Sequence, residues 1–150
     1  MSLHPKKARQ YMDWCLAGAE VFATCGTRQY MAILLDARHR VVGVGYNGGP
    51  ARAKHCVDGG CPRLAENSPP GSNYDNCIAI HAEQNAFLNS VSDARILIVN
   101  GPPCYTCAKM IVNSSVEAVY FLPDESYDQW IEVQSFMTKN KVRTIPVASK

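Results

Sequence analysis

The sequence lacks any apolar run long enough to cross a membrane, and it lacks a strong excess of either charge. Its longest apolar stretches, around 95–99 and 116–122, are far shorter than the roughly 20 residues of a membrane-spanning helix. The formal net charge is only +2 over 150 residues, whereas nucleic-acid-binding proteins usually carry a clustered basic stripe. We therefore expect no membrane segment and no nucleic-acid partner.

The start of the chain also lacks a secretory pattern. Residues 1–7 carry charge, but no apolar stretch with a small-residue cleavage site follows them, so we expect a cytoplasmic protein. Cytoplasmic thiols stay reduced, and the chain has seven cysteines, an odd number. These cysteines therefore favour metal ligation or reactive thiols over a disulfide framework.

Neither low-complexity tracts nor internal repeats occur, and charged residues make up only 19% of the chain against 47% hydrophobic residues. This balance is typical of a folded globular protein, and 150 residues suffice for one domain but not for two. We expect a single domain over 1–150, with an irregular, cysteine-containing insertion at about 47–76 that is crowded with Gly, Pro, Asn and Ser.

Hydrophobic periodicity predicts an α/β protein. Helices are predicted at 6–22, 78–90, 104–114 and 127–139, and strands at 30–35, 40–46, 95–99, 118–122 and 142–146. The first two strands are separated by four polar residues and are expected to form an antiparallel hairpin. The later alternation of helix and strand favours βαβ units, with helices on both faces of one sheet.

Two short motifs carry the chemical signal, and each opens a predicted helix. His81-Ala82-Glu83 begins one helix and Pro103-Cys104-Tyr105-Thr106-Cys107 begins the next. Residues three apart lie on one helix face, so the thiolates of Cys104 and Cys107 can share a metal with His81. Three protein ligands leave the fourth tetrahedral position of zinc open, as in catalytic sites. This pair of motifs is the signature of zinc-dependent nucleobase deaminases.

Glu83 lies two residues from His81, and residues two apart face different sides of a helix. It is therefore unsuited as a further ligand. We expect Glu83 to act as a proton shuttle, taking a proton from water and delivering it to the ring nitrogen and then to the leaving amine.

Each motif alone has simpler interpretations. An isolated CxxC is often a redox pair or half of a structural zinc site, and an isolated His is usually not a ligand. A non-enzymatic zinc module would have no need for Glu83. The combination of both motifs with Glu83 favours the catalytic interpretation.

Three stretches resemble the deoxycytidylate (dCMP) deaminases of bacteria and phages, within the zinc-dependent cytidine deaminase superfamily. They read VGYNGGP at 44–50, HAEQNA at 81–86 and PCYTCAKMI at 103–111, and the resemblance runs from about 25 to 127. GYNGxP and the Asn of HAExNA are the more specific parts. Transfer-RNA adenosine, guanine and riboflavin-pathway deaminases resemble the chain less there.

The resemblance implies a three-layer α-β-α cytidine-deaminase-like fold with a mixed five-stranded sheet. It also implies conversion of dCMP to dUMP and ammonia, which supplies dUMP for thymidylate synthesis. Asn47 would contact the substrate sugar, the backbone of Ala82 would hold the pyrimidine, and Tyr127 would border the pocket. Without the resemblance, Asn47 would be interpreted as a turn residue and Tyr127 as a packing residue. Alternative substrates are 5-methyl- or 5-hydroxymethyl-dCMP, dCTP, a free nucleoside, or a base in nucleic acid.

A mononucleotide needs a phosphate site, for which guanidinium groups are common partners. Arg28 is our first candidate, and Arg52, Lys54 and Arg63 are the others; taken singly, a solvated surface charge is the simpler interpretation of each.

The remaining cysteines also suggest a metal. Phage members of the family can hold a second, structural zinc at positions that match Cys25 and Cys56, and Cys61 and Cys77 would complete four thiolates. Buried inert thiols are the simpler interpretation, and we expect it for Cys15, on the apolar face of the first helix.

Relatives are often hexamers activated by dCTP, with which Mg²⁺ can bind, and inhibited by dTTP. The resemblance therefore implies a homo-oligomer, hexamer or dimer, in the cytoplasm, or in the host cytoplasm if the gene is a phage gene. Met31 departs from the glycine that is usual at its position, which weakens the expectation of such regulation.

Overall fold

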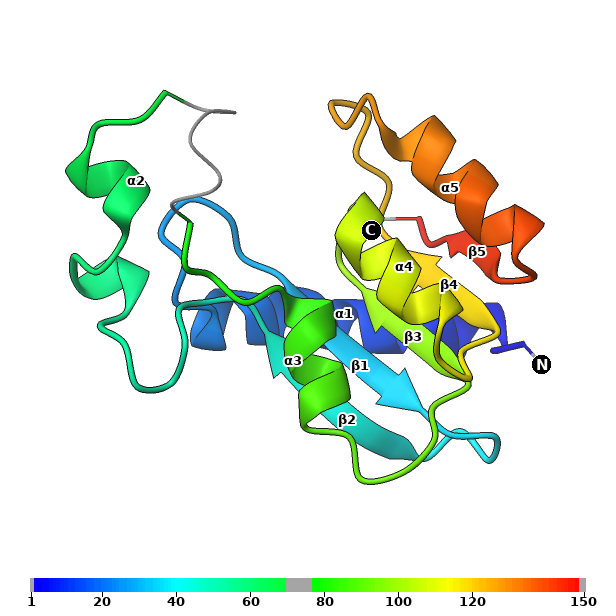
Figure 1. Ribbon diagram of the computed structural model, residues 1–150. Coiled ribbons are helices and arrows are strands. Elements are labelled where there is room, and N and C mark those ends of the chain that lie inside the picture. The colour runs from blue at the N-terminus through cyan, green and yellow to red at the C-terminus, as the bar shows by residue number, and fades with distance from the viewer. Residues whose placement is uncertain (1, 70–76, 149–150) are drawn as a thin grey trace.

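The computed structural model describes residues 2–69 and 77–148, and its centre is one mixed five-stranded sheet with the strand order β2-β1-β3-β4-β5 (Figure 1). β1 runs antiparallel to both β2 and β3, while β3, β4 and β5 are parallel. The elements are α1 (Pro5–Phe22), β1 (Met31–Leu35), β2 (Val41–Tyr46), the 3₁₀ turn η1 (Cys56–Asp58), α2 (Pro62–Ala65), α3 (Ala82–Leu88), β3 (Ile96–Val99), α4 (Tyr105–Val112), β4 (Ala118–Phe121), α5 (Trp130–Lys139) and β5 (Arg143–Pro146).

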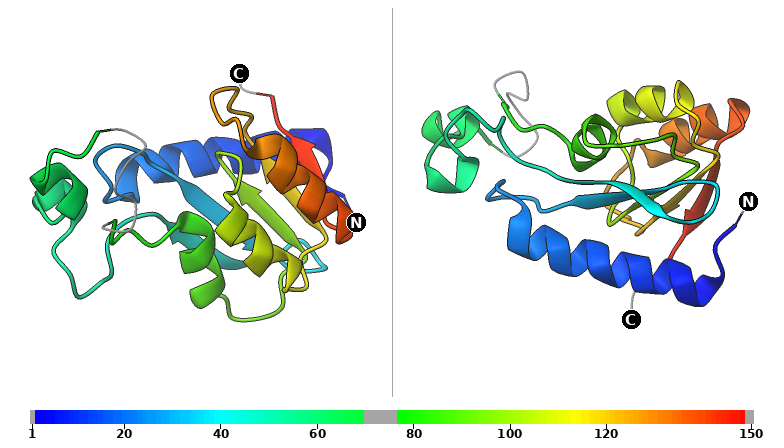
Figure 2. Two further views of the ribbon diagram at one scale, coloured as in Figure 1. Left: turned by 45° about the horizontal axis from the view of Figure 1, so that its top comes forward. Right: turned by 90° about the horizontal axis from the view of Figure 1, so that it is seen from below.

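Helices cover both faces of this sheet. α1 lies alone on one face, and α3, α4 and α5 lie together on the other (Figure 2). The three central strands β1, β3 and β4 are buried along their whole length, which explains why they are continuous apolar runs and not alternating ones. The predicted α-β-α layering with a mixed five-stranded sheet is thus confirmed.

The two faces of the sheet hold two separate hydrophobic clusters. Under α1, Met12 and Cys15 belong to one buried cluster with Ile33 and Ile98. On the opposite face, residues of α4 and α5 join the side chains of β1, β3 and β4 in a second cluster, which includes Leu34, Leu97, Ile111, Val119 and Met137. The second cluster forms the layer on which the two motif-bearing helices rest.

Met31, the residue that departs from the family's usual glycine, is a core residue of the α1 face. It is 2% exposed, and a Cβ added to Gly18 of α1 would collide with its sulfur. The absence of a side chain at Gly18 therefore makes the space that Met31 fills.

Some element boundaries differ from the predicted ones. The helix predicted at 78–90 starts only at Ala82, because the backbone of Ile80 pairs with Gly48 in an antiparallel bridge. The last helix starts at Trp130, so Tyr127 precedes it instead of opening it. The predicted irregular insertion contains two short helical turns, η1 and α2, and its residues 70–76 lie outside the described part of the chain.

Among the described residues, no helix combines the length and the apolar character that a bilayer crossing requires.

Candidate metal centre and active site

The helix that carries His81 and Glu83 lies unusually close to the edge strand β2, because two glycines face it. A Cβ added to Gly43 would lie 2.6 Å from the carbonyl oxygen of Ala86. One added to Gly45 would lie 2.7 Å from the carbonyl carbon of Asn85 and still closer to Ala82 and Ala86. Atoms cannot approach so closely without moving, so the alternating glycines of β2 fix the depth at which α3 sits.

Polar contacts then fix the orientation of α3. The side-chain amide of Asn85 donates to the carbonyl of Tyr46 at 2.8 Å, and the side chain of Gln84 accepts from the backbone N–H of His81 at 2.9 Å. The Gly48–Ile80 bridge holds the chain immediately before His81. The more specific parts of the sequence motifs, GYNG and the Asn of HAExNA, are therefore the contacts that position His81.

The two cysteines of the second motif lie at the start of α4. Cys104 is the N-cap residue of this helix and Cys107 lies in its first turn. Gly101, just upstream, packs against the ring of Tyr30, whose Cε1 atom would lie 2.7 Å from an added Cβ. A helix N-terminus favours negative charge, so this location favours thiolates.

His81, Cys104 and Cys107 form the one cluster of potential metal ligands found among the described residues. The Nδ1 atom of His81 lies 3.3 Å from the sulfur of Cys107 and 3.4 Å from that of Cys104. Nitrogen and sulfur ligands of a tetrahedral zinc lie about 3.5 Å apart, given bonds of about 2.0–2.1 Å and 2.3 Å. The three predicted ligands therefore fit one zinc ion.

The electrostatics of the three groups also fit a cation. The hydrogen bond from Cys107 lowers the pKa of Cys104 to about 4, and His81 lowers it further. The hydrogen bond with Cys104 raises the pKa of His81, and the hydrogen bond with Cys104 together with burial raises that of Cys107. A metal ion bound by these three groups would compete with protons for the same nitrogen and sulfur atoms.

Glu83 is buried, with 6% of its surface exposed, and it lies beside the cluster without belonging to it. Burial raises the pKa of its carboxyl group, against the effect of its own backbone N–H. Its side chain also has a hydrogen bond with Cys107. A carboxyl group with a raised pKa next to a metal site is suited to act both as a proton acceptor and as a proton donor.

Two of the predicted pocket residues, Ala82 and Tyr127, lie near this cluster. Ala82 is the first residue of α3 and is 1% exposed. Tyr127 is half-buried; burial raises the pKa of its hydroxyl, and Cys104, Cys107 and Glu83 add to this effect. The phenol thus lies within electrostatic range of the metal cluster.

Asn47 uses both ends of its side-chain amide within the protein. Its oxygen accepts from the backbone N–H of Tyr30 at 2.8 Å, and its nitrogen donates to the carbonyl of Arg28 at 2.9 Å. The sequence suggested a sugar contact or a turn for Asn47; the structure shows an additional task, which is to hold the segment that precedes β1.

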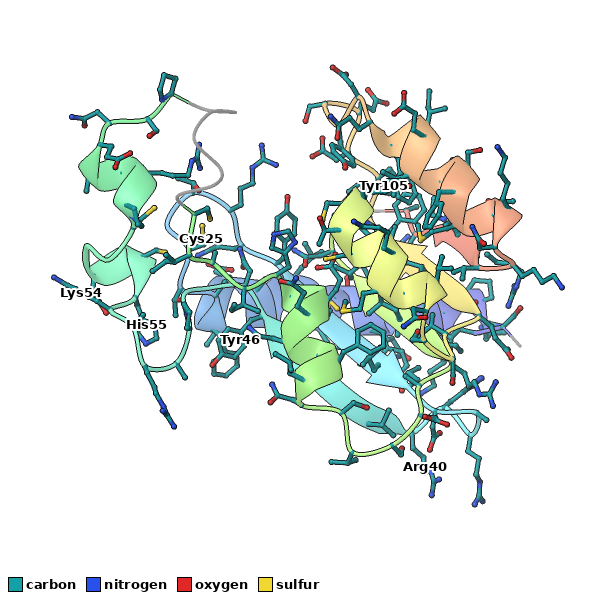
Figure 3. All side chains as sticks on the ribbon, in the orientation of Figure 1. Cys25, Arg40, Tyr46, Lys54, His55 and Tyr105 are labelled. Atoms are coloured by element: carbon teal, nitrogen blue, oxygen red, sulfur yellow. The ribbon has the colours of Figure 1, made fainter. Side chains whose placement is uncertain are left out.

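Four of the five cysteines outside the catalytic motif line a cavity of about 320 Å³, together with Arg28 and Arg63. Figure 3 shows Cys25 on the side of the body that faces the segment with η1 and α2. Among the described residues, however, His81, Cys104 and Cys107 lie close enough together to share one metal ion, and these four sulfurs do not. The cysteines are Cys25, Cys56, Cys61 and Cys77.

Of the four basic candidates for phosphate binding, two do not line this cavity. Arg52 and Lys54 are exposed on the loop that follows β2, and Lys54 points away from the body of the molecule (Figure 3). Arg63 donates to the carbonyl of Pro69. Arg28 also acts on Asp124, whose pKa is lowered first by hydrogen bonds from Ser126 and then by the Arg28 charge.

Sequence reasoning did not identify Tyr30 and Asn100. The side chain of Asn100 binds the backbone of Gln29 and Met31, and the ring of Tyr30 packs beside Gly101. An Asn-Gly pair directly after a strand was the available signal, but it is typical of any turn.

Comparison with known proteins places this geometry in a family. Residues 5–123 match the model described as the cytidine and deoxycytidylate deaminase zinc-binding region. The chain is 39% identical over 110 residues to the deoxycytidylate deaminase of Mycobacterium phage D29, an alignment that covers 68% of this chain and 83% of that protein.

Two further proteins are similar to this chain, and they differ in how much of their own length the similarity covers. The deoxycytidylate deaminase of Schizosaccharomyces pombe is 35% identical over 103 residues, which is 66% of this chain but only 32% of the yeast protein. The chain thus spans about a third of that relative's length. A dCMP deaminase from the cyanophage S-TIM5, solved in complex with dCMP and dUMP, has a TM-score of 0.73 at 22% identity and covers 97% of this chain and 99% of its own, which shows a shared fold.

The zinc-fitting cluster, the buried carboxyl group beside it and the match over most of the chain lead to one conclusion: this chain belongs to the cytidine and deoxycytidylate deaminase family.

Proposed function

We propose that this protein is a zinc-dependent deaminase that converts dCMP and water to dUMP and ammonia. The observation that carries the proposal is the cluster of His81, Cys104 and Cys107 with the buried carboxyl group of Glu83 beside it. Three ligands for a tetrahedral ion leave one position for a reactant, whereas a structural zinc site would use all four.

The roles of the residues follow from their positions. His81, Cys104 and Cys107 would hold the zinc, which when bound acts as a Lewis acid and lowers the pKa of water. Glu83 takes a proton from water as the oxygen adds to C4 of the cytosine ring, and passes it to N3. The carboxylate then takes the proton of the new C4 hydroxyl group and delivers it to the exocyclic nitrogen, the C4–N bond breaks, and ammonia leaves as the carbonyl forms. The raised pKa of Glu83 suits this exchange of protons.

The support for dCMP as substrate comes from the relatives and from the edge of the site. The matched proteins from Mycobacterium phage D29 and from yeast are both deoxycytidylate deaminases. Arg28 supplies a guanidinium group, a common partner of phosphate, on the segment that Asn47 holds. Tyr127 and Ala82 would border the base.

A substrate panel tests the proposal. Zinc-loaded protein is incubated with dCMP, its 5-methyl and 5-hydroxymethyl forms, dCTP, deoxycytidine and single-stranded DNA, and ammonia release is measured. The proposal predicts the largest kcat/KM for dCMP. A preference for any other compound would replace dCMP as the substrate, and activity on DNA alone would assign the chain to nucleic-acid editing.

We also propose a structural zinc at the second cysteine cluster. In the cavity of about 320 Å³, Cys56 shares a hydrogen bond with Cys61, and burial first, then Cys61, Cys25 and Cys77, raise the pKa of Cys56 to about 11. Mutual repulsion of this kind is relieved when a cation binds the thiolates. Binding a single ion would require the four sulfurs to move closer together.

The turn at Cys25 supports this second site. Burial opposes ionisation of the Cys25 thiol, but hydrogen bonds from the Thr27 hydroxyl and from the backbone N–H groups of Arg28 and Thr27 outweigh it, so its pKa is lowered. Backbone amides that converge on a sulfur stabilise a thiolate ready to bind metal.

Metal analysis decides between one and two ions. The proposal predicts two zinc ions per chain in the wild type, and one in a Cys56→Ser variant. Cys15→Ala is the matched control, because Cys15 is buried under α1 and should leave the count at two. A single zinc in fully active wild-type protein would refute the second site. The effectors dCTP, dTTP and Mg²⁺ and a hexameric or dimeric assembly stay predictions of the family resemblance.

A further inference from the structure

Two asparagines hold the short segment before β1 from its two sides. The side chain of Asn47, just after β2, binds the carbonyl of Arg28 and the N–H of Tyr30, at 2.9 and 2.8 Å. The side chain of Asn100, just after β3, binds the carbonyl of Gln29 and the N–H of Met31, at 3.1 and 2.8 Å. Four consecutive residues thus each give one backbone group to one of two side-chain amides.

This pattern continues the sheet beyond the ends of its strands. In an extended strand, the backbone groups of successive residues point to opposite sides. Here the groups of 28 and 30 point toward β2 and those of 29 and 31 point toward β3, the two neighbours of β1. On the β2 side, the backbone N–H of Asn47 also donates to the carbonyl of Tyr30 at 3.2 Å. The asparagine side chains bind the four backbone groups named above and so extend the pairing of β1 with both of its neighbours.

Because residues 28–31 are extended, their side chains also alternate between the two faces of the sheet, and this alternation determines which of them face the metal cluster. Met31 packs against Gly18 of α1, and Tyr30 packs against Gly101 on the opposite face, where Cys104 lies. Residues two apart in an extended segment share a face, so Arg28 lies on the same face as Tyr30. The effect of Arg28 on Asp124, three residues before Tyr127, agrees with this placement.

We propose that Asn100 is a positioning residue of the nucleotide site: together with Asn47 it keeps residues 28–31 extended, so that Arg28 meets the phosphate of the substrate. This inference rests on the proposed nucleotide deaminase function. A shift of one residue in this segment would turn Arg28 and Tyr30 toward α1, which is why both sides of the segment need a partner.

The experiment compares a nucleotide with its nucleoside. For dCMP, Arg28→Ala should raise KM by about 10- to 100-fold, as expected for loss of a hydrogen bond to a charged group. Asn100→Ala should raise KM for dCMP by about tenfold and change kcat by less than about threefold. For deoxycytidine, which has no phosphate, both variants should leave KM within about twofold of the wild type.

The two substitutions should also be coupled. In an Arg28→Ala background, Asn100→Ala should raise the KM for dCMP by less than about twofold, because the group that Asn100 positions is already gone. Asn140→Ala is the matched control: its amide donates to the carbonyl of Phe136 at 2.8 Å at the end of α5, so this variant loses a similar bond but keeps the wild-type KM.

Two measurements keep the outcome interpretable. Zinc content and thermal unfolding show whether Asn100→Ala is folded; if it is not, Asn100→Asp keeps the acceptor for Met31 and should show an intermediate rise in KM. Equal losses on dCMP and deoxycytidine, or additive effects of Arg28 and Asn100, would overturn the positioning role. Absence of dCMP turnover in the wild type would instead refute the proposed function, and the same comparison would then be made with the nucleotide that is turned over.

Discussion

The depth of α3 on the sheet can be tested at one glycine. A methyl group at Gly45 would lie 2.7 Å from the carbonyl carbon of Asn85 and closer still to Ala82 and Ala86, whereas carbon atoms pack at about 3.5–4.0 Å. α3 would have to move by roughly 1 Å to admit it. The obstructing atoms are backbone, so no side chain can rotate away. Since α3 carries His81 and Glu83, the whole movement is passed to the metal site.

Gly45→Ala should therefore affect both stability and activity. Overpacking of this kind destabilises by about 1–3 kcal/mol, which lowers the midpoint of thermal unfolding by about 2–4 °C per kcal/mol. A displacement of about 1 Å at a catalytic group reduces the rate by about 10²-fold. Both are measured on zinc-loaded protein, by calorimetry and by deamination kinetics.

The matched control is Gly49→Ala in the same motif, where an added Cβ would have its closest contact at 3.5 Å, an ordinary distance. It should behave like the wild type. If Gly45→Ala also kept the wild-type melting temperature and rate, the close approach of α3 to β2 would not determine the geometry of the site.

Three further predictions concern the rest of the fold. Gly18→Ala should destabilise the protein by about 1–3 kcal/mol because its methyl group collides with Met31. In calorimetry, the double variant Gly18→Ala/Met31→Ala should lose less unfolding free energy than the sum of the two single variants. Additive losses would contradict the contact between these two residues. Asp36 accepts hydrogen bonds from the backbone of Arg40 and Arg38 and from the Arg40 guanidinium, and these, the Arg40 backbone bond first, lower its pKa. The stabilising effect of the Asp36 carboxylate is present above the unfolded pKa of about 3.9 and is lost as the pH falls through the lower folded pKa. The difference in urea midpoint between the wild type and Asp36→Asn should therefore be constant at neutral pH and disappear in acid. A difference that does not depend on pH would refute the stabilising role of the ionised carboxylate. Burial raises the pKa of Cys15 well above its usual range, so a maleimide at neutral pH should modify Cys15 only after unfolding, as mass spectrometry of the labelled peptides would show.

The metal site could be predicted from the sequence because its determinants are local. His81 and Glu83 are adjacent to a helix start, as are Cys104 and Cys107, and a fixed spacing at a helix start places side chains almost independently of the rest of the fold. The hairpin and the buried strands were predictable for a similar reason, since their apolar runs and the polar turn between them are continuous in the chain.

The surroundings of the site depend on contacts between distant segments and were not predictable in this way. The start of α3 is set by the pairing of Ile80 with Gly48, which no local propensity reports. The role of Asn100 depends on a partner about 70 positions earlier in the chain. A single Asn-Gly pair carries no information about such a partner, so only the assembled sheet shows what the side chain does.

The role of Glu83 as proton shuttle is tested by the rate of dCMP deamination in a Glu83→Gln variant that retains the zinc content of the wild type. We predict that the variant binds the same amount of zinc, because Glu83 is not a ligand, and that its kcat falls by at least about 10²-fold, because no other group transfers the protons. A zinc-loaded Glu83→Gln protein that converts dCMP to dUMP at the wild-type rate would contradict this role.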